Sequence, residues 1–388
     1  MTPFAPKCVA HSKARVMIVE DSSVVQELLR HLIAADPRLE VVACVKSGEE
    51  AIRLLDRVLP DVISLDIRLP GMNGLETAQH IMAKLPTPIV VVSASVEADD
   101  LRISISALRA GALAVVEKPI AASNDDYRRL GGHLCTQLAL MSRVKVVRQR
   151  IDRGLRFGKP APELVSSGRP LKPVISARAR PAEGLRFSVL GLAASTGGPG
   201  ALQTLLTGLN ADFPLPIVLV QHIAEGFSDG FISWLDEVVP ALSVKVAKAG
   251  ELLRPGFVYV APADRHVQID NCRLMLNHGK MVSGQRPSAT VLFASMARSL
   301  GPAALAVLLT GMGDDGAAGL KDVFDAGGYT IAEDASTAVV YGMPRAAAQL
   351  GAVNEMLPLD KISRRLQEIT RIEASPTSGN ASIVARSR

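Results

Sequence analysis

Ser195 stands where an apolar stretch, "FSVLGLAA", runs into the glycine-rich turn "STGGPG". Two other apolar stretches lead to residues that can do chemistry, because "PIVLVQ" precedes His222 and "AALAVLLTGMG" precedes Asp314 and Asp315. If these stretches are parallel neighbouring strands, a serine, a histidine and an aspartate meet at one edge of a sheet. A nucleophilic hydrolase needs this set of side chains.

Each of these side chains has a chemical task in such a site. A serine hydroxyl is a weak nucleophile until a base takes its proton, and an imidazole such as that of His222 is suited to this work. The second imidazole nitrogen needs a carboxylate to orient it, which is the task expected of an aspartate in "GMGDDG". Gly197 and Gly198 permit a sharp turn into a helix and leave backbone N–H groups for a developing oxyanion.

The same residues have less specific explanations. A lone histidine after a strand is more often structural than catalytic, and Ser195 alone could cap the following helix. The turn is related to the G-x-S-x-G nucleophile elbow, with Ala193 in place of the first glycine, but the order Ser, His, Asp differs from that of α/β-hydrolases. A Rossmann phosphate loop fits less well, because the G-x-G-x-x-G spacing is absent and no acidic residue ends the next strand.

The first third of the chain contains a second set of strand-end residues. Between residues 14 and 120, five apolar runs alternate with segments of helical spacing, which predicts a doubly wound parallel α/β domain. Carboxylates that converge at one edge of such a sheet attract a hard cation, most naturally Mg²⁺, and a nearby lysine and hydroxyl would stabilise a phosphoryl group. The residues expected there are Glu20, Asp21, Asp66, Ser93 and Lys118.

Composition and charge exclude several classes of protein. The 388 residues suffice for two globular domains, and four scattered cysteines without an apolar leader indicate reduced thiols and a cytoplasmic location. No apolar run is long enough to span a membrane. Residues 142–186 carry 12 Lys or Arg against 3 acidic residues, so the net charge of +5 belongs to one linker. This linker has hardly any aromatic residues and no recognition-helix pattern, which argues against nucleic-acid binding.

These patterns predict an α/β protein with two domains. The first domain is expected at residues 14–122. The second is expected at 185–373, with a parallel sheet whose apolar runs include "HVQI". A helix and a flexible basic linker are expected between them, at 123–184. Disordered tails are expected at 1–13 and 374–388, where the residues are small and polar.

The first domain resembles a response-regulator receiver domain over essentially all of residues 14–120. The motifs that carry the resemblance are the acidic pair "ED", the segment "LDIRLPGMNGLE", the serine after "PIVVV" and "EKP". The resemblance implies a flavodoxin-like fold and phosphorylation of Asp66 by a chemotaxis-type histidine kinase. It also implies Mg²⁺ held by Asp21, Asp66 and the backbone carbonyl of Arg68, with Ser93 and Lys118 contacting the phosphoryl oxygens. Val115 departs from the family, which usually has Tyr or Phe there as a switching side chain.

The second domain resembles the catalytic domain of the chemotaxis protein-glutamate methylesterases, the CheB family. The matching motifs are "ASTGG", "QH", "PGFVYVAPADRH", "RPS", "LTGMGDDGAAGL" and "YGMPRAA". The resemblance implies a triad of Ser195, His222 and Asp315, with Asp314 in a variable position. Ala193 and Thr290 are departures, since the family usually has Gly and Asp there. The residues expected to support the oxyanion or its loop are Thr196, Gly197, Gly198 and Met312.

The function implied by the resemblance is a phosphorylation-regulated esterase. It would hydrolyse glutamate methyl esters on the cytoplasmic helices of chemoreceptors, without a cofactor for the esterase step, and its activities would include deamidation of receptor glutamines. Two alternatives stay open at this point. One is a receiver joined to a non-catalytic output domain, such as a DNA-binding regulator, and the other is the same kind of esterase acting on a non-chemosensory receptor.

Overall fold

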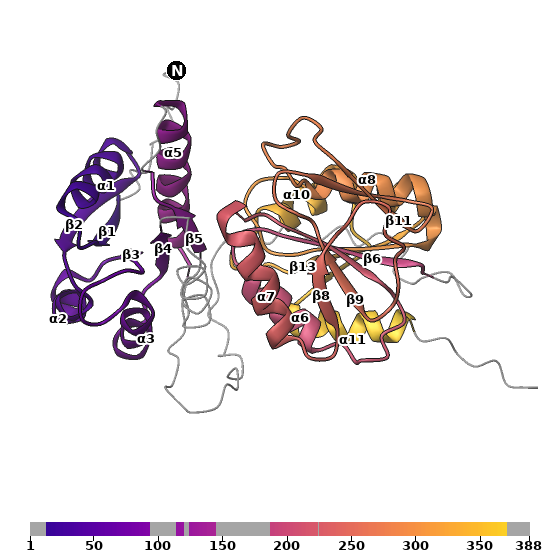
Figure 1. Cartoon of the computed structure of the whole chain (residues 1–388), viewed down its shortest axis with the longest axis horizontal. Coiled ribbons are helices and arrows are strands. Elements are labelled where there is room, and N and C mark those ends of the chain that lie inside the picture. Colours follow the sequence, from indigo (N-terminus) through magenta and orange to yellow (C-terminus); the bar gives the residue numbers. More distant parts are fainter. Residues whose placement is uncertain (1–12, 94–113, 120–123, 145–186, 224, 371–388) are drawn as a thin grey trace, which may run out of the picture.

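The computed structural model describes residues 13–93, 114–119, 124–144, 187–223 and 225–370 (Figure 1). The terminal tails predicted from the sequence, apart from Lys13, lie outside these residues, as does the predicted linker beyond residue 144. The described residues form two sheets with helices on their faces and one separate hairpin.

The first domain contains a parallel sheet of five strands in the order β2-β1-β3-β4-β5. This is the flavodoxin-like order, in which the chain reverses direction beside β1 and ligands bind at the carboxyl ends of the strands. The strands are apolar along their length because helices cover both faces. The strands are β1 (Ala14–Val19), β2 (Leu39–Val45), β3 (Val62–Asp66), β4 (Ile89–Ser93) and β5 (Ala114–Glu117).

Three helices of this domain begin at residues whose side chains accept a hydrogen bond from the first turn. Ser22 caps α1 (Ser23–Ala35), Ser47 caps α2 (Gly48–Val58), and Asn73 forms a capping box with α3 (Gly74–Lys84). Such caps satisfy backbone N–H groups that have no partner inside the helix. They place each helix start directly after the strand-end loop that carries the polar residues.

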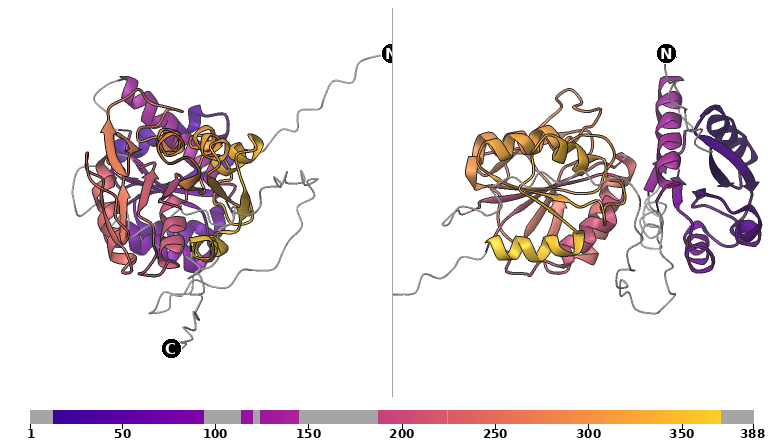
Figure 2. Two further views of the ribbon diagram at one scale, coloured as in Figure 1. Left: turned by 90° about the vertical axis from the view of Figure 1, so that its right-hand side faces the viewer. Right: turned by 180° about the vertical axis from the view of Figure 1, so that it is seen from behind.

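Helix α5 (Asn124–Met141) packs against the first domain, whereas the sequence analysis ended that domain at residue 122 and assigned the following helix to the linker. Its residues Leu134, Leu138 and Met141 are buried in one cluster with Val16 and Ile18 of β1. This apolar face is too short and irregular in sequence to distinguish a docked helix from the start of a linker. In Figure 1 and in the right panel of Figure 2, α5 lies on the side of its domain that faces the second domain.

The second domain is built on a parallel sheet of seven strands in the order β14-β13-β12-β6-β7-β9-β8. From the central strand β6 the chain proceeds to β7 on one side and later to β12 on the other, so the topological switch point lies beside β6. The strands are β6 (Val189–Ala194), β7 (Ile217–Gln221), β8 (Ser243–Val246), β9 (Phe257–Val260), β12 (Ala304–Leu308), β13 (Tyr329–Glu333) and β14 (Glu355–Leu357).

Two helical layers cover this sheet (Figures 1 and 2). Alternate residues of β6 show the division, because Leu190 and Leu192 face one core cluster while Val189 and Ala193 face the other. The first layer comprises α6 (Gly198–Thr207), α7 (Ser228–Val238) and α11 (Leu359–Thr370). The second comprises α8 (Ala289–Leu300), α9 (Ala317–Asp325) and α10 (Met343–Gln349).

A hairpin of β10 (His266–Asp270) and β11 (Arg273–Asn277) forms a separate antiparallel sheet. The sequence placed the run "HVQI" among the strands of the main pattern, which is wrong. Val267 and Ile269 instead pack into the core on the α8 side, and the Ile269 N–H donates to Ser295 Oγ of α8 at 2.9 Å. An apolar alternation alone does not distinguish a strand of the central sheet from a hairpin laid over a helix.

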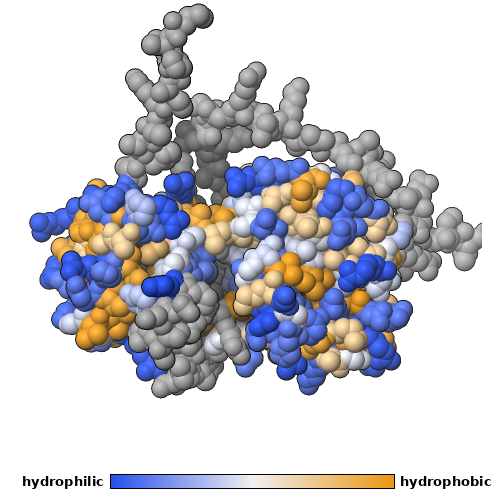
Figure 3. Space-filling view, turned by 90° about the horizontal axis from the view of Figure 1, so that it is seen from above, coloured by the Kyte–Doolittle hydropathy of each residue, from blue (hydrophilic) through white to orange (hydrophobic). Residues whose placement is uncertain are grey.

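Both domains together confirm the α/β fold class predicted from the sequence. Hydrophobic residues lie in small groups among hydrophilic ones on the face seen in Figure 3. None of the helices in the described part of the chain is long and apolar enough to cross a membrane.

Candidate active site and phosphoacceptor site

Ser195 lies directly after β6, in a turn that only glycine permits at two positions. Gly197 has a φ of +79°, and a Cβ at this position would lie 2.5 Å from Val339 Cβ. A Cβ on Gly198 would lie 2.0 Å from Gln221 Oε1. The Ser195 N–H donates to the carbonyl of Thr310 at 3.0 Å, so the turn is attached to the end of β12.

His222 and Asp315 are in direct contact at the same edge. His222 follows β7, Asp315 follows β12, and His222 Nε2 lies 2.8 Å from Asp315 Oδ2. Both side chains are almost fully buried, with 7% and 2% exposed. The structure thus brings two members of the predicted triad together and places the third, Ser195, at the end of the strand between β7 and β12.

The Asp315 carboxylate is surrounded by donors at the N-terminus of α8. Ser288 Oγ donates to Oδ1 at 2.7 Å, the Ala289 N–H to Oδ2 at 2.7 Å, and the Thr290 N–H to Oδ1 at 3.1 Å. Burial opposes the charge, but His222, Ser288 and the Ala289 N–H lower the pKa of Asp315 to about 2. The positive end of the α8 dipole favours the same ionised form.

The ionised carboxylate determines which imidazole nitrogen carries the proton. A carboxylate only accepts hydrogen bonds, so His222 Nε2 must donate to Asp315. His222 Nδ1 is then the basic nitrogen, and it is buried without a hydrogen-bond partner among the described residues. Ser195 Oγ likewise makes no hydrogen bond to any residue that the structure describes. His222 Nδ1 and Ser195 Oγ, at neighbouring strand ends, are therefore both without a hydrogen-bond partner among the described residues.

The residues expected around an oxyanion differ in whether their backbone N–H groups already donate a hydrogen bond. The Gly198 N–H donates to Ser195 O at 2.8 Å, so the expectation that this group is free is wrong: the turn uses it. The N–H groups of Thr196, Gly197 and Met312 donate to no carbonyl within the described ranges. The side-chain amide of Gln137 on α5 donates to Thr196 Oγ1 at 3.3 Å, and the Thr196 hydroxyl lies 3.4 Å from Gln137 Oε1, to which it can donate. The first domain therefore contacts the residue after Ser195.

Sequence reasoning missed several residues that hold this site. Gln221 Nε2 donates to the carbonyls of both Ser195 and His222, each at 2.9 Å, and so ties the two residues together. Thr310 accepts from the Ser195 N–H through its carbonyl and donates from its hydroxyl to Thr196 O at 2.9 Å. Gln221 belongs to the quoted "QH" pair, but a spacing pattern does not reveal what a side-chain amide holds.

Ser288 and two of its neighbours form a second supporting group. Besides binding Asp315, Ser288 donates its N–H to His266 Nδ1 at 3.2 Å. His266, the first residue of β10, therefore helps to fix the start of α8. Thr290, where the family usually has Asp, accepts from the Gly316 N–H at 2.8 Å and steadies the residue after Asp315.

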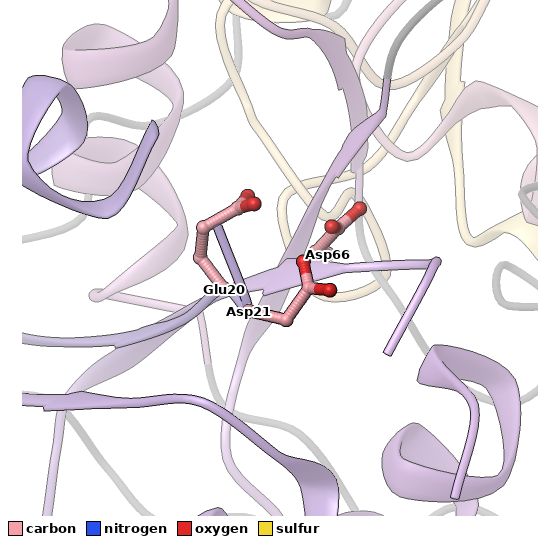
Figure 4. A group of neighbouring side chains, drawn as sticks. All are labelled: Glu20, Asp21 and Asp66. Atoms are coloured by element: carbon pink, nitrogen blue, oxygen red, sulfur yellow. The ribbon is translucent and has the colours of Figure 1, made fainter. Parts of the chain in front are cut away.

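The acidic residues of the first domain also converge, as Figure 4 shows. Carboxylate oxygens of Glu20, Asp21 and Asp66 lie within 4.8 Å of one another at the ends of β1 and β3. Lys118 Nζ donates to Asp66 Oδ2 at 2.8 Å and to Glu20 Oε1 at 3.2 Å. Ser93 is buried at the end of β4, and its carbonyl accepts a hydrogen bond from the Lys118 backbone N–H at 2.9 Å.

The electrostatics of this cluster fit a divalent cation. Burial raises the pKa of Glu20, with repulsion from Asp66 adding to it, and burial also raises the pKa of Asp66. Burial alone would lower the pKa of Lys118, but its hydrogen bonds to Asp66 and Glu20 raise it. Carboxylates that crowd together in this way, with hard oxygen atoms facing one space, suit Mg²⁺. The Arg68 N–H donates to Asp66 Oδ1 at 3.3 Å, which keeps its backbone beside the cluster.

The fold and the two sites together define a class: a receiver-type acidic site on one α/β domain, joined to a Ser-His-Asp arrangement on another. Comparisons with known proteins agree with this class. The family model for response regulator receiver domains matches residues 16–124, and that for CheB methylesterase matches residues 190–366.

Curated relatives extend over almost the whole chain. A protein-glutamate methylesterase/protein-glutamine glutaminase of Paramagnetospirillum magneticum is 52% identical over 92% of this chain and 97% of its own length. One from Myxococcus xanthus is 43% identical over the same shares. The crystal structure of the Thermotoga maritima CheB methylesterase catalytic domain covers 47% of this chain and 98% of that chain, with 37% identity and a TM-score of 0.45. The chain belongs to the CheB family of protein-glutamate methylesterases, which confirms the resemblance stated from its motifs.

Proposed function

We propose that Ser195 is the nucleophile of this methylesterase, His222 its base and Asp315 the residue that orients the base. The observation that carries the proposal is the buried pair of His222 and Asp315, which leaves His222 Nδ1 as the basic nitrogen at the strand end next to Ser195. Asp314 is exposed and has no comparable set of donors, so we assign it no role in the triad.

The reaction follows from these roles. His222 Nδ1 takes the Ser195 hydroxyl proton as Oγ attacks the ester carbonyl of a receptor glutamate methyl ester. The N–H groups of Thr196, Gly197 and Met312 are available to the oxyanion that forms. The same proton passes from His222 to the departing methoxide, which leaves as methanol. Water, deprotonated by His222, then attacks the acyl-enzyme and releases the glutamate. Attack on a glutamine side chain would release ammonia by the same steps.

We further propose that Asp66 is the phosphoacceptor of a histidine kinase. Asp21, Asp66 and the Arg68 carbonyl would hold Mg²⁺, with Glu20 beside them. Mg²⁺ would supply charge neutralisation at the phosphoryl oxygens when bound. Lys118, which now occupies the space between Glu20 and Asp66, would turn to a phosphoryl oxygen, and Ser93 would contact another. Val115 lies partly buried against the core, so no aromatic side chain switches there.

The contact between α5 and the nucleophile turn supports regulation by occlusion. Gln137 touches Thr196, and Val339 and Val340 of the second domain pack against the cluster that contains α5. Phosphorylation at Asp66 would change the surface of the first domain and release this contact. The substrate partner would then be a methylated chemoreceptor helix, met in the cytoplasm.

The decisive experiment measures methanol release from purified, methylated receptors by the full-length protein, with and without a small phosphodonor. We expect release that increases with the phosphodonor and is absent with Ser195→Ala. Release from methylated chemoreceptors but not from a non-chemosensory receptor would identify the substrate class. No release from any methylated receptor, with the protein folded and phosphorylated, would contradict the proposed activity.

A further inference from the structure

Glu333 is a fully buried carboxyl group at the end of β13, beside the strand that leads to Thr310. Its Oε2 accepts one hydrogen bond, from the Thr310 N–H at 2.8 Å. Its Oε1 is buried and has no hydrogen-bond partner among the residues that the structure describes. A carboxylate normally takes several donors when it is buried and charged, so this environment is a poor one for the ionised form.

Thr310, the residue that Glu333 holds, is the point of attachment of the nucleophile turn. Its carbonyl accepts from the Ser195 N–H at 3.0 Å, and its hydroxyl donates to Thr196 O at 2.9 Å. The same hydroxyl accepts from the Val340 N–H at 2.9 Å, and Val340 packs against the cluster that contains α5. A displacement of Thr310 would therefore move Ser195 and the segment that meets the first domain.

The surroundings of Glu333 offer no compensating positive charge. Burial raises the pKa of Glu333 to about 7, the Thr310 N–H and the Thr337 hydroxyl lower it, and repulsion from Asp334 raises it. None of the described Lys, Arg or His residues forms an ion pair with it. None of the other titratable side chains on the described elements packed against β13, or on the loop after it, shifts the pKa of Glu333. They are Lys321, Asp322 and Asp325 of α9, Tyr341 of the loop, Arg345 of α10, Glu355 of β14, and Asp360, Lys361, Arg364, Arg365 and Glu368 of α11.

Glu355 on the adjacent strand β14 shows what a compensated carboxylate looks like in this domain. It accepts from Arg365 at 2.6 Å, and Tyr329 Oη donates to it as well. Glu355 has no hydrogen bond to Thr310 or to the nucleophile turn. It is thus a matched control: a partly buried glutamate one strand further from Ser195, paired with a cation.

We propose that Glu333 is a positioning residue whose neutral carboxyl group keeps Thr310, and with it the turn that carries Ser195, in the reactive arrangement. Ionisation places a charge on a buried carboxyl group whose Oε1 has no donor among the described residues, and the charge recruits further donors or water at the expense of the present geometry. The esterase reaction then slows as Glu333 loses its proton. This inference rests on the proposed role of Ser195 as nucleophile.

The test is the pH profile of kcat and KM for a small neutral ester, measured with the full-length protein. In the wild type we expect the rate to fall on raising the pH, because this alkaline limb reports ionisation of Glu333. Glu333→Gln, in which the side chain is always neutral, should lose this alkaline limb. One pH unit above the transition, the variant should exceed the wild type in kcat by up to about tenfold, with KM little changed, because Glu333 does not touch substrate.

Glu355→Gln is measured alongside as the control. Its alkaline limb should match that of the wild type even if the variant is less stable. Survival of the alkaline limb in Glu333→Gln, or its loss in both variants, would overturn the inference. Ser195→Ala subtracts the uncatalysed hydrolysis, and residual enzymatic turnover in that variant would count against the proposed nucleophile instead, so the two failures are distinguishable.

A second measurement keeps the inference testable if Glu333→Gln does not fold. Infrared difference spectra of wild-type protein labelled with ¹³C-glutamate should show a protonated carboxyl band that disappears on raising the pH through about 7. Absence of such a band at pH 6 in folded protein would show that Glu333 is already ionised, and the inference would be wrong.

Discussion

The two domains both place carboxylates at the carboxyl ends of parallel strands, yet they treat the charge in opposite ways. Asp315 accepts from His222, Ser288 and two backbone N–H groups, and its pKa is held at about 2. Asp66 and Glu20 share one cation, Lys118, and burial raises the pKa of both. One site is complete without anything from solution, whereas the other has carboxylate charge that a metal ion can neutralise.

This difference explains how similar strand ends support different chemistry. A carboxylate saturated with protein donors is held in one orientation and can orient an imidazole without taking its proton. Carboxylates that are crowded and incompletely compensated favour the arrival of a cation and a phosphoryl group. Three donors to Asp315 come from the start of α8, whereas none of the described helices of the first domain begins with donors to Asp66.

The largest expected effect separates the two sites completely. Ser195→Ala should reduce methanol release by roughly three decades or more, because the variant lacks the hydroxyl that forms the acyl-enzyme. Phosphorylation of Asp66 and the thermal unfolding temperature should not change, since Ser195 lies outside the first domain and carries no packing that alanine removes. Labelling by a serine-directed fluorophosphonate should disappear in parallel. Retention of most methanol release would remove Ser195 from the reaction.

Substitution of Asp314 and Asp315 gives the next largest effect and tests directly the site in which protein donors surround the carboxylate. Asp315→Asn should reduce kcat by roughly two to four decades, because the NH₂ group of the amide would face either His222 Nε2 or the N–H groups of α8. These groups are themselves donors, so the hydrogen bond that orients the imidazole or those that hold the side chain would be lost. Asp314→Asn is the matched control: this exposed neighbour should lose less than about threefold. Equal losses in the two variants, or a greater loss at Asp314, would reverse the assignment.

The sequence predicted the strand ends of both sites but not the residues that support them. Ser195, His222 and Asp66 each follow a continuous apolar run, and parallel strands bring the ends of such runs to one edge. Gln221, Thr310 and Glu333 follow equivalent runs, but their roles arise from contacts between segments more than 20 residues apart. No local period encodes such contacts. The same limitation separated α5 from its domain, since its apolar face is recognisable only against β1.

Removing the first domain should have an intermediate effect on basal activity, because the fragment keeps the Ser195 site and lacks the Asp66 site. A fragment lacking residues 1–167 retains both core clusters of the second domain and should fold. Its basal methanol release should exceed that of the unphosphorylated full chain by roughly 5- to 150-fold, the usual range of coupling free energies between sites. Full-length protein with Asp66→Asn should release methanol at the low basal rate, and the phosphodonor should not increase it. If the fragment is no faster than the full chain, occlusion is wrong and the first domain acts mainly by recruitment.

The smallest effect concerns the hydrogen-bonded contact between Gln137 of α5 and Thr196 of the nucleophile turn. Gln137 is buried, and its amide lies 3.3 Å from Thr196 Oγ1, one residue from Ser195. A neutral hydrogen bond contributes about 0.5 to 1.5 kcal/mol, so Gln137→Ala should raise the basal activity of the unphosphorylated protein by roughly 2- to 10-fold. The phosphorylated protein, in which the contact is already released, should not respond. Thr136→Ala is the control, because within the described part of the chain the neighbouring Thr136 side chain bonds to Gly132 and Arg38 of its own domain. Equal activation by both substitutions would mean that loosening α5, rather than breaking its contact with Thr196, raises the rate. A Gln137→Ala protein that is no faster than the wild type would show that this contact does not restrain the nucleophile turn, and the restraint would then lie with Val339 and Val340.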